Sequence, residues 1–239
     1  MLRRLTRDDP AYAGQAAYTP PVLAVYDWLF LGLEGRLVWR CPRQTVLDWY
    51  DTHVSANHLD FGVGTGYFLD HCRFPSPSPA ITLVDANPTP LRWTARRLRR
   101  YQPRTHLADV LKPLDLGGQR FDSIGLSHVL HCLPGSFPAK ASRVFQNLKP
   151  LLHEGGVLFG VTIPGRGVAH GTPARLLLRL YNALGVLSNA EDDLVGLQQA
   201  LEEAFARHQL AVHGSMVLFA AGQRDPSARL RMPRNGASG

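Results

Sequence analysis

The feature that most constrains this chain is a glycine-rich turn at residues 59–67, with the sequence Leu-Asp-Phe-Gly-Val-Gly-Thr-Gly-Tyr. Gly62, Gly64 and Gly66 can adopt positive φ, and their missing side chains let a ligand approach the backbone closely. The apolar run before the turn predicts a buried strand, and residues 67–72 predict the start of a helix. A strand, a tight glycine turn and a helix N-terminus together form a binding site for nucleotide-like ligands.

Length and composition are those of one globular α/β domain. The chain has 239 residues, of which 45% are hydrophobic and 19% charged. No apolar run approaches the ~18 residues that span a bilayer, and no apolar segment follows the basic N-terminus as in a secretory signal. Cys41, Cys72 and Cys132 lack metal-binding spacing. We therefore expect reduced cysteines, no metal site, no membrane span and a cytoplasmic protein.

The basic charge has a simple interpretation. The net charge is +7, and only three of the 26 basic residues are lysines. The densest group of arginines lies at residues 92–104 on a predicted helix, where helical spacing spreads the side chains apart. Because no array of aromatic residues accompanies them, a solvated helix face is expected and a nucleic-acid partner is not.

Strands and helices alternate along most of the chain. Two apolar helices are predicted first, at 22–33 and 36–52. Strands are then predicted at 58–61, 81–85, 105–108, 121–126, 157–163, 210–213 and 216–221. Helices are predicted between them at 91–101, 139–152 and 174–184, and a further one is expected to begin at an Asn189 N-cap with residues 191–193 in its first turn. This alternation predicts a mainly parallel sheet covered on both faces.

The glycine spacing distinguishes between several known classes of nucleotide-binding site. A P-loop is excluded because no Gly-Lys-Ser/Thr follows the turn. A dinucleotide fold usually places its third glycine one position further along and lacks an acidic residue two positions before the first glycine. An NAD-dependent oxidoreductase therefore remains only an outside alternative.

The segment Asp60-x-Gly62-x-Gly64-Thr65-Gly66 resembles motif I of the class I S-adenosylmethionine-dependent methyltransferases, and further motifs follow in the family's order. Asp85 ends the second strand, where the family has its ribose-binding acid. The remaining matches are residues 107–110, 121–133 and 148–158, and the resemblance spans roughly residues 55–222.

The resemblance implies a fold, a cofactor and a division of the chain. The fold is a Rossmann-like seven-stranded mostly parallel sheet, with the last strand antiparallel, flanked by helices and preceded by an N-terminal helical cap. S-adenosylmethionine is the cofactor and S-adenosylhomocysteine the product. The expected regions are an arm and helical lid (1–55), the cofactor-binding domain (56–222) with a substrate-wall insertion (164–188), and a flexible tail (223–239).

The same resemblance assigns roles to individual residues. Asp85 is expected to accept hydrogen bonds from both ribose hydroxyls. Asp109 is expected to accept from the adenine amine and the Val110 amide to bond a ring nitrogen, while Asp60 places negative charge near the ligand's ammonium. The residues expected to bind the cofactor are Asp60, Gly62, Gly64, Gly66, Asp85, Ala86, Asp109, Val110, Ser127 and Tyr26.

The candidates for acid–base chemistry follow the fourth strand. His128 and His131 titrate near neutral pH and are three residues apart, so either is a candidate general base; packing beside the cofactor is the alternative. His170 is a more distant candidate. The expected lid residues are Tyr18, Tyr26, Trp28, Phe30 and Trp39, and the opposite wall is expected at residues 164–187.

The leading interpretation is a methyltransferase acting on a small or medium apolar molecule, with oxygen weakly favoured as the acceptor and a role in secondary metabolism as one setting. An RNA or protein methyltransferase is the alternative among enzymes. A protein that binds S-adenosylmethionine without transferring its methyl group is the alternative from another class, because motif I reports binding and not turnover. A small-molecule partner and a homodimer are the expected associations.

Overall fold

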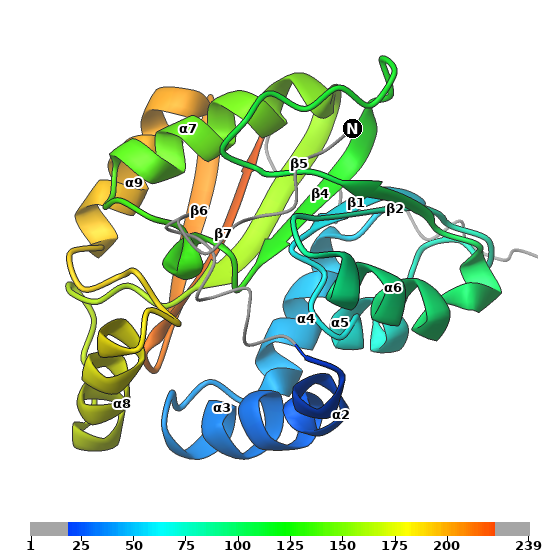
Figure 1. Cartoon of the computed structure of the whole chain (residues 1–239). Coiled ribbons are helices and arrows are strands. Elements are labelled where there is room, and N and C mark those ends of the chain that lie inside the picture. Colours follow the sequence, from blue (N-terminus) through cyan, green and yellow to red (C-terminus); the bar gives the residue numbers. More distant parts are fainter. Residues whose placement is uncertain (1–18, 223–239) are drawn as a thin grey trace, which may run out of the picture.

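The computed structural model describes residues 19–222, and its centre is a seven-stranded sheet (Figure 1). The strands are β1 (Asn57–Phe61), β2 (Ala80–Asp85), β3 (Arg104–Leu107), β4 (Phe121–Ser127), β5 (Leu152–Thr162), β6 (Arg207–His213) and β7 (Met216–Gly222). Their order is β3-β2-β1-β4-β5-β7-β6, and β7 runs antiparallel to both of its neighbours while the other pairs are parallel. The predicted Rossmann-like sheet with an antiparallel last strand is confirmed.

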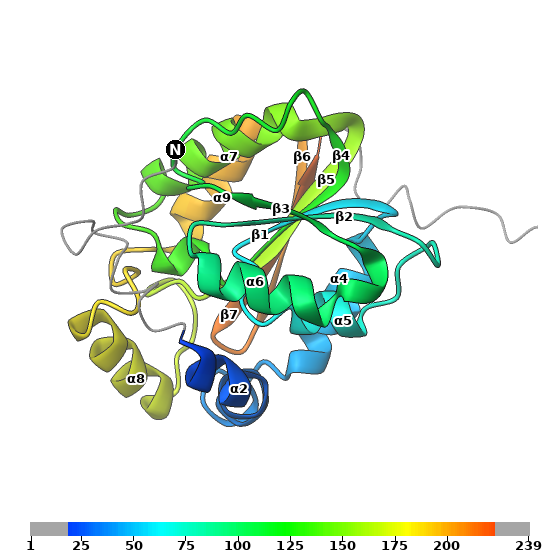
Figure 2. The same ribbon diagram turned by 45° about the vertical axis from the view of Figure 1, so that its right-hand side comes forward.

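Helices cover both faces of the sheet, as Figures 1 and 2 show. They are α2 (Pro20–Trp28), α3 (Gly35–Leu37), α4 (Arg43–His53), α5 (Tyr67–His71), α6 (Pro88–Arg97), α7 (Ala139–Leu148), α8 (Thr172–Ala183) and α9 (Leu194–Ala204). On one face, α7 and α9 pack Phe145 and Leu201 against Phe219 of the sheet. On the other face, α4 and α5 pack Tyr50 and Leu69 with Phe159. Strands buried on both faces explain their nearly continuous apolar sequences.

The N-terminal helix does not remain a regular α-helix. α2 passes through a wider π-helical turn, η1 (Leu29–Glu34), into the short α3. The changed pitch turns Phe30, Leu31 and Glu34 toward one cavity, whereas Leu33 and Leu37 are exposed to solvent. In Figure 1 these segments and α8 lie together at the lower end of the molecule.

One predicted helix–strand boundary was wrong. The helix expected at 139–152 ends at Leu148 and is followed by a 3-10 turn at Lys149–Leu151, and β5 begins at Leu152 instead of 157. Leu152 pairs with Phe121, and the register shifts before the next pair, Ser123 with Val157. Gly155 and Gly156 therefore lie in an irregular part of the strand, although their sequence is typical of a turn.

The predicted Asn189 cap was also wrong. Asp193 is the N-cap of α9, and its side chain accepts a hydrogen bond from the Gly196 amide at 2.5 Å. Asn189 is fully buried, and its side-chain amide donates to the Ile163 carbonyl at 2.7 Å and accepts from Asn182. Asn and Asp both favour the N-cap position, so only the tertiary contacts show which of Asn189 and Asp193 caps the helix.

Candidate active site

The glycine turn joins β1 to α5 and forms one wall of a cavity. Gly62, Gly64 and Gly66 have φ values of +71°, +51° and +74°. A side chain at Gly62 would overlap Val129, and one at Gly66 would lie 2.6 Å from Thr94. Beside the Cβ position of Gly64 there is open space. The turn therefore needs glycine for its backbone, and at Gly64 it leaves room for a ligand.

Asp85 ends β2 in the same cavity and is only 8% exposed. Its Oδ1 accepts a hydrogen bond from the Asn87 amide at 2.8 Å. Burial raises the pKa of Asp85 to about 7; hydrogen bonds from the backbone of Asn87, Val63 and Ala86 act in the opposite direction, and the charge of Asp60 adds to the increase. A buried carboxylate at the wall of the cavity is suited to accept hydrogen bonds from a diol.

Asp60 ends β1 beneath the glycine turn and is 5% exposed. The buried Tyr50 hydroxyl donates to Asp60 Oδ1 at 3.1 Å, and His58 Nε2 lies 3.5 Å from the same oxygen. A side chain at Gly125 of β4 would overlap this carboxylate. The position of Asp60 is therefore fixed by three elements, β1, β4 and α4.

The other residues predicted to bind a cofactor line this same cavity. Asp109 and Val110 follow β3, Ala86 follows β2, and Ser127 ends β4. Tyr26 of α2 lies across from them, and all ten predicted residues are among those lining the cavity. The structure thus brings together residues from five segments of the chain. The most distant two, Tyr26 and Ser127, are 101 positions apart in the sequence.

A second cavity of about 310 Å³ adjoins the first. Its walls are mainly apolar and come from the N-terminal segment, the turn after β4 and the region after β5; they include Phe30, Trp39, Ile163, Leu187 and Met216. Five side chains line both cavities: Tyr26, Leu31, Phe68, His128 and Cys132. The two cavities therefore meet at His128 and Tyr26.

The two predicted catalytic histidines both line the second cavity, but only His128 also lines the first, and their surroundings differ. His128 has a φ of +60° and its ring stacks on Phe68, with centroids 6.1 Å apart. His131 is 4% exposed, and its Nδ1 accepts a hydrogen bond from the Ile163 amide at 3.1 Å. Because a backbone N–H only donates, neutral His131 carries its proton on Nε2. Burial lowers the pKa of His128 to about 4 and the pKa of His131 well below its usual range.

The half-buried carboxylate of Glu34 lines the second cavity. Trp39 Nε1 donates to Glu34 Oε1 at 2.7 Å, and the Tyr181 hydroxyl donates to Glu34 Oε2 at 3.0 Å. Burial raises the pKa of Glu34, and the two hydrogen bonds oppose that shift. Glu34 thereby joins the N-terminal segment to α8 across the cavity, a contact that no sequence pattern indicated.

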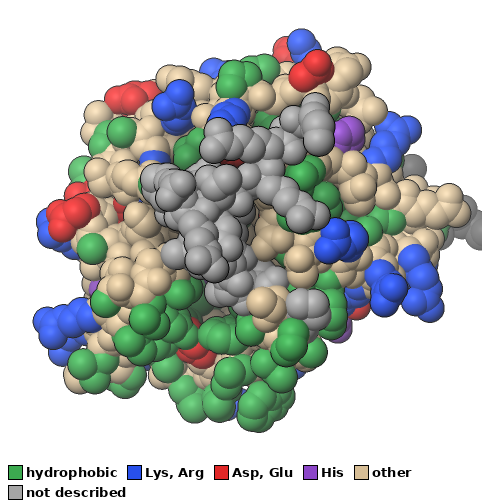
Figure 3. Space-filling model, viewed as in Figure 1, with side chains coloured by type: hydrophobic (Ala, Val, Ile, Leu, Met, Phe, Trp, Pro, Cys, Tyr) green, Lys and Arg blue, Asp and Glu red, His purple; other side chains and the backbone are tan. Residues whose placement is uncertain are grey.

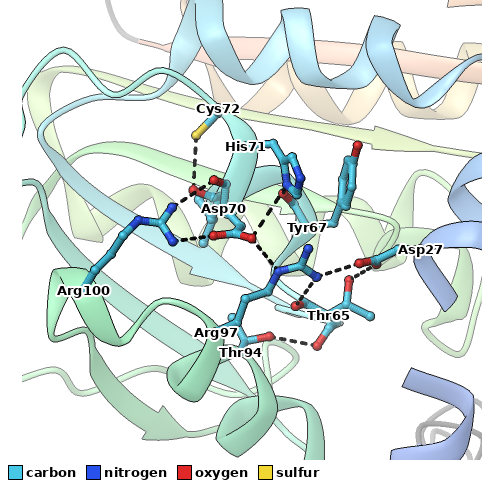
Figure 4. A network of polar contacts seen from close by, with 11 residues as sticks. Asp27, Thr65, Tyr67, Asp70, His71, Cys72, Thr94, Arg97 and Arg100 are labelled. Carbon is cyan, nitrogen blue, oxygen red and sulfur yellow. Dashed lines mark hydrogen bonds and ion pairs between the residues drawn. The ribbon is translucent and has the colours of Figure 1, made fainter. Parts of the chain in front are cut away.

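A polar network ties the N-terminal helix to the glycine turn (Figure 4). Asp27 of α2 accepts from the Thr65 hydroxyl at 2.5 Å and from Arg97 Nη1 at 2.6 Å. Arg97 also donates to the Thr65 carbonyl at 3.2 Å and to Asp70 at 2.8 Å. Since Asp27 is next to Tyr26, this network holds Tyr26 where the cavities meet.

The turn that carries His131 is held by a buried ion pair. Lys140 Nζ lies 2.7 Å from Asp192 Oδ2 and donates to the carbonyls of Leu133 and Ser188 at 3.0 and 2.6 Å. The Ser188 amide in turn donates to the His131 carbonyl at 2.8 Å. Burial lowers the pKa of Lys140 and raises that of Asp192 to about 6. Asp192 was predicted to lie in the first turn of a helix, and this interpretation was wrong.

Not every predicted lid residue faces the cavities. Tyr26, Phe30 and Trp39 do, but Trp28 is 70% exposed and points to solvent. Tyr18 lies outside the described residues. His170 bonds the Pro164 carbonyl at 2.9 Å and lines neither cavity. Sequence reasoning missed Asp27, Glu34 and the Lys140–Asp192 pair, because their partners are distant in the chain.

Residues 19–222 contain neither a membrane-spanning helix nor a metal-binding cluster. None of the described helices has the length and apolar character needed to cross a membrane. Within the same range, no group of three or more His, Cys, Asp or Glu side chains is arranged to hold a metal ion.

Comparison with known proteins adds the family. Residues 59–158 match the family described as "Methyltransferase domain". The chain is 38% identical over 218 residues to a demethylluteothin O-methyltransferase of Streptomyces thioluteus, and this alignment covers 91% of this chain and 94% of the relative. It is 37% identical over 214 residues to a physcion biosynthesis cluster O-methyltransferase of Aspergillus chevalieri, covering 89% and 96%.

Solved structures agree in fold. A complex described as DhpI–SAH superposes with a TM-score of 0.61 at 12% identity, covering 92% of this chain and all of that chain. A cavity of suitable residues, a matching domain and relatives aligned over nearly their whole length lead to one conclusion. The chain belongs to the class I S-adenosylmethionine-dependent methyltransferases that act on small molecules.

Proposed function

We propose that this enzyme methylates a hydroxyl oxygen of a small or medium apolar molecule, with the methyl donor in the first cavity and the acceptor in the second. One observation carries the proposal: His128 lines both cavities, at the position where an acceptor hydroxyl would meet the donor. The two O-methyltransferase relatives support oxygen as the acceptor atom.

The residues of the first cavity fit S-adenosylmethionine. The open space beside Gly64 admits the methionine portion, and the buried Asp85 would accept from the ribose hydroxyls. Asp60 would face the ammonium group, while Asp109 and Val110 would bond the adenine edge. When bound, the cofactor supplies a methyl group on a positively charged sulfur, which is a good leaving group.

The second cavity fits an apolar acceptor. Its volume of about 310 Å³ and its mainly apolar walls favour a compact apolar molecule over a nucleic acid or a peptide. Transfer requires the acceptor oxygen in line with the methyl carbon, and holding both reactants in fixed adjoining cavities supplies much of the rate. Apolar walls also exclude water from the reaction.

The two histidines are assigned different tasks. The proposal of His128 as base rests on its place in both cavities. Burial lowers its pKa to about 4, which keeps the ring neutral at pH 7 but also weakens it as a base; it would take the hydroxyl proton as the O–C bond forms and the S–C bond breaks. His131 has its lone pair on Nδ1 occupied by the Ile163 amide, so its Nε2–H is suited to donate to an acceptor oxygen. His128 is therefore the proposed base, and His131 the proposed orienting donor.

The remaining expectations stay proposals of the same kind. Residues 1–55 are proposed as arm and lid, 56–222 as the cofactor domain, 164–188 as the substrate wall and 223–239 as a tail. A cytoplasmic location is proposed from the three free cysteines. A homodimer is proposed with no interface assigned.

The test is transfer of a labelled methyl group to matched acceptors. Aromatic compounds carrying a hydroxyl, an amine or a thiol at the same position are incubated with methyl-labelled S-adenosylmethionine. Label is expected on the hydroxyl compound. Label on the amine or thiol alone would contradict oxygen as the acceptor, and tight cofactor binding without transfer to any acceptor would support the non-methylating alternative.

A further inference from the structure

Exposed apolar side chains are concentrated on one surface of the molecule. Among the described residues, nine large hydrophobic side chains are exposed, and seven of them lie on two segments beside the second cavity. These seven are Val25, Trp28, Leu33, Leu37, Leu176, Leu180 and Leu184. We call them the outer lid surface. Figure 3 shows hydrophobic side chains gathered along the lower edge, where Figure 1 places α8 and the N-terminal helices.

On α8 the outward side chains form a regular row. Leu176 and Leu180 are 61% and 50% exposed, and Leu184, one turn later, is 59% exposed. Arg175 and Arg179 are exposed beside this row, while Ala174 and Leu178 are buried against the core. A helix that only covers a core has a polar outer face, so the outer face of α8 is unusual for a surface helix.

The N-terminal segment presents the same combination. Trp28 is 70% exposed and Leu37 is 62% exposed, although both are large apolar side chains. Arg36 and Arg40 are exposed close to them in the sequence. Tryptophan with arginine and leucine is the composition of segments that lie in the interface between water and lipid.

The charge of this surface has a single sign. Residues 172–188 contain no acidic residue, and residues 19–40 contain only Asp27 and Glu34. Asp27 is paired with Arg97, and Glu34 accepts from Trp39 and Tyr181 inside the cavity. The two segments therefore carry exposed arginines beside exposed apolar side chains, and neither acid on them is in the exposed class.

We propose that the outer lid surface docks on an anionic lipid bilayer, without crossing it. Apolar side chains that enter the headgroup region and arginines that pair with lipid phosphates act together in such binding. A second copy of this chain fits less well, because a two-fold interface brings the same surface of both copies together and would place arginine against arginine. If the proposed function also holds, the second cavity opens where an apolar acceptor is dissolved.

The test is binding to vesicles, which does not depend on methyl transfer. The full chain is sedimented with vesicles of phosphatidylcholine alone and of phosphatidylcholine mixed with phosphatidylglycerol. Binding is expected only with the anionic vesicles and is expected to weaken with salt. Quenching of tryptophan fluorescence by brominated lipid tails reports which tryptophans reach the bilayer. Because the protein contains four tryptophans, the quenching lost in the Trp28→Phe variant gives the part that comes from Trp28.

Matched variants separate this surface from the rest of the molecule. The double variant Leu176→Ser/Leu180→Ser is compared with the double variant Val195→Ser/Val212→Ser. Val195 and Val212 are 73% and 49% exposed but lie outside the outer lid surface. The double variant Arg175→Gln/Arg179→Gln is compared with Arg104→Gln/Arg120→Gln. Arg104 is the first residue of β3, Arg120 directly precedes β4, and both are exposed. Vesicle affinity is expected to fall roughly fivefold for each arginine lost from the outer lid surface.

Three outcomes would overturn the proposal. The first is equal binding to both kinds of vesicle, or none. The second is an equal loss of binding in the control variants. The third is a concentration-dependent dimer, measured by analytical ultracentrifugation, that the α8 variants abolish; this result would assign the surface to a second copy of the chain. Methyl transfer to a water-soluble acceptor is measured separately, so failure of the docking and failure of the proposed function remain distinguishable.

Discussion

The two cavities of this enzyme are built in different ways. The first is lined by carboxylates and amides at the ends of three adjacent strands, β1, β2 and β3, and much of it comes from short motifs such as residues 60–66. The second is mainly apolar and is assembled from the N-terminal segment, the turn after β4 and the region after β5. Binding of a fixed cofactor is therefore encoded locally, whereas the shape that selects an acceptor depends on segments far apart in the chain.

This comparison predicts that a change at the junction affects turnover more than cofactor binding. His128→Ala is expected to lower kcat about a hundredfold, since general-base catalysis contributes at least that factor. Affinity for S-adenosylhomocysteine, measured by calorimetry, is expected to remain within about twofold, because cofactor binding depends mainly on the strand-end carboxylates. The control is His153→Ala, at an exposed histidine. Equal activity of the two variants would leave His128 as a packing residue.

A change in the first cavity should act in the opposite way. Asp85→Ala is expected to weaken S-adenosylhomocysteine binding by about 1.5–3 kcal/mol, through loss of charge-assisted hydrogen bonds. Titration calorimetry measures this directly. Asp115→Ala, at an exposed carboxylate, is the control. An unchanged affinity in the Asp85 variant would remove this residue from the cofactor site.

The pH dependence of cofactor binding provides a finer test of the same cavity. Burial raises the pKa of Asp85 to about 7 in the free protein, so below pH 7 a proton must leave before the carboxylate can accept two ribose hydrogen bonds. Affinity for S-adenosylhomocysteine is expected to rise about tenfold between pH 6 and pH 8 and then level off. Asp85→Asn is expected to bind more weakly with little pH dependence. The same slope in both proteins would assign the titration to another group.

The smallest expected effect concerns the connection between the N-terminal helix and the glycine turn. Asp27→Asn is expected to raise the KM for the acceptor about threefold to fivefold, because a mostly buried ion pair with Arg97 is weakened and Tyr26 is held less firmly. Asp51→Asn removes a comparable pair with Arg73, whose side chain is 84% exposed. Steady-state kinetics with both variants decides the matter, and equal KM values would show that the Asp27 network only stabilises the fold.

Much of the first cavity could be predicted because its residues sit at the ends of strands that the sequence displays. Apolar runs before Asp60 and Asp85 identify β1 and β2, and parallel strands that are neighbours bring their ends together. The boundary of β5 was harder, because Gly155 and Gly156 resemble a turn while the chain continues as an irregular strand. Local propensity cannot reveal a register shift that depends on the partner strand.

The sequence by itself determined a mostly parallel seven-stranded sheet, and its resemblance to a family added the cofactor and the side chains around it, since strand patterns and glycine motifs are local features of the chain. Only the tertiary structure decided which side chains face the acceptor. Trp28 faces solvent and Phe30 faces the cavity. Residues two positions apart lie on nearly opposite sides of a helix, and the packing of the N-terminal segment on the rest of the molecule decides which side is turned inward. The proton position on His131 likewise depends on a hydrogen bond from the Ile163 amide, 32 positions away in the chain. The contact of Glu34 with Tyr181 joins residues that are 147 positions apart.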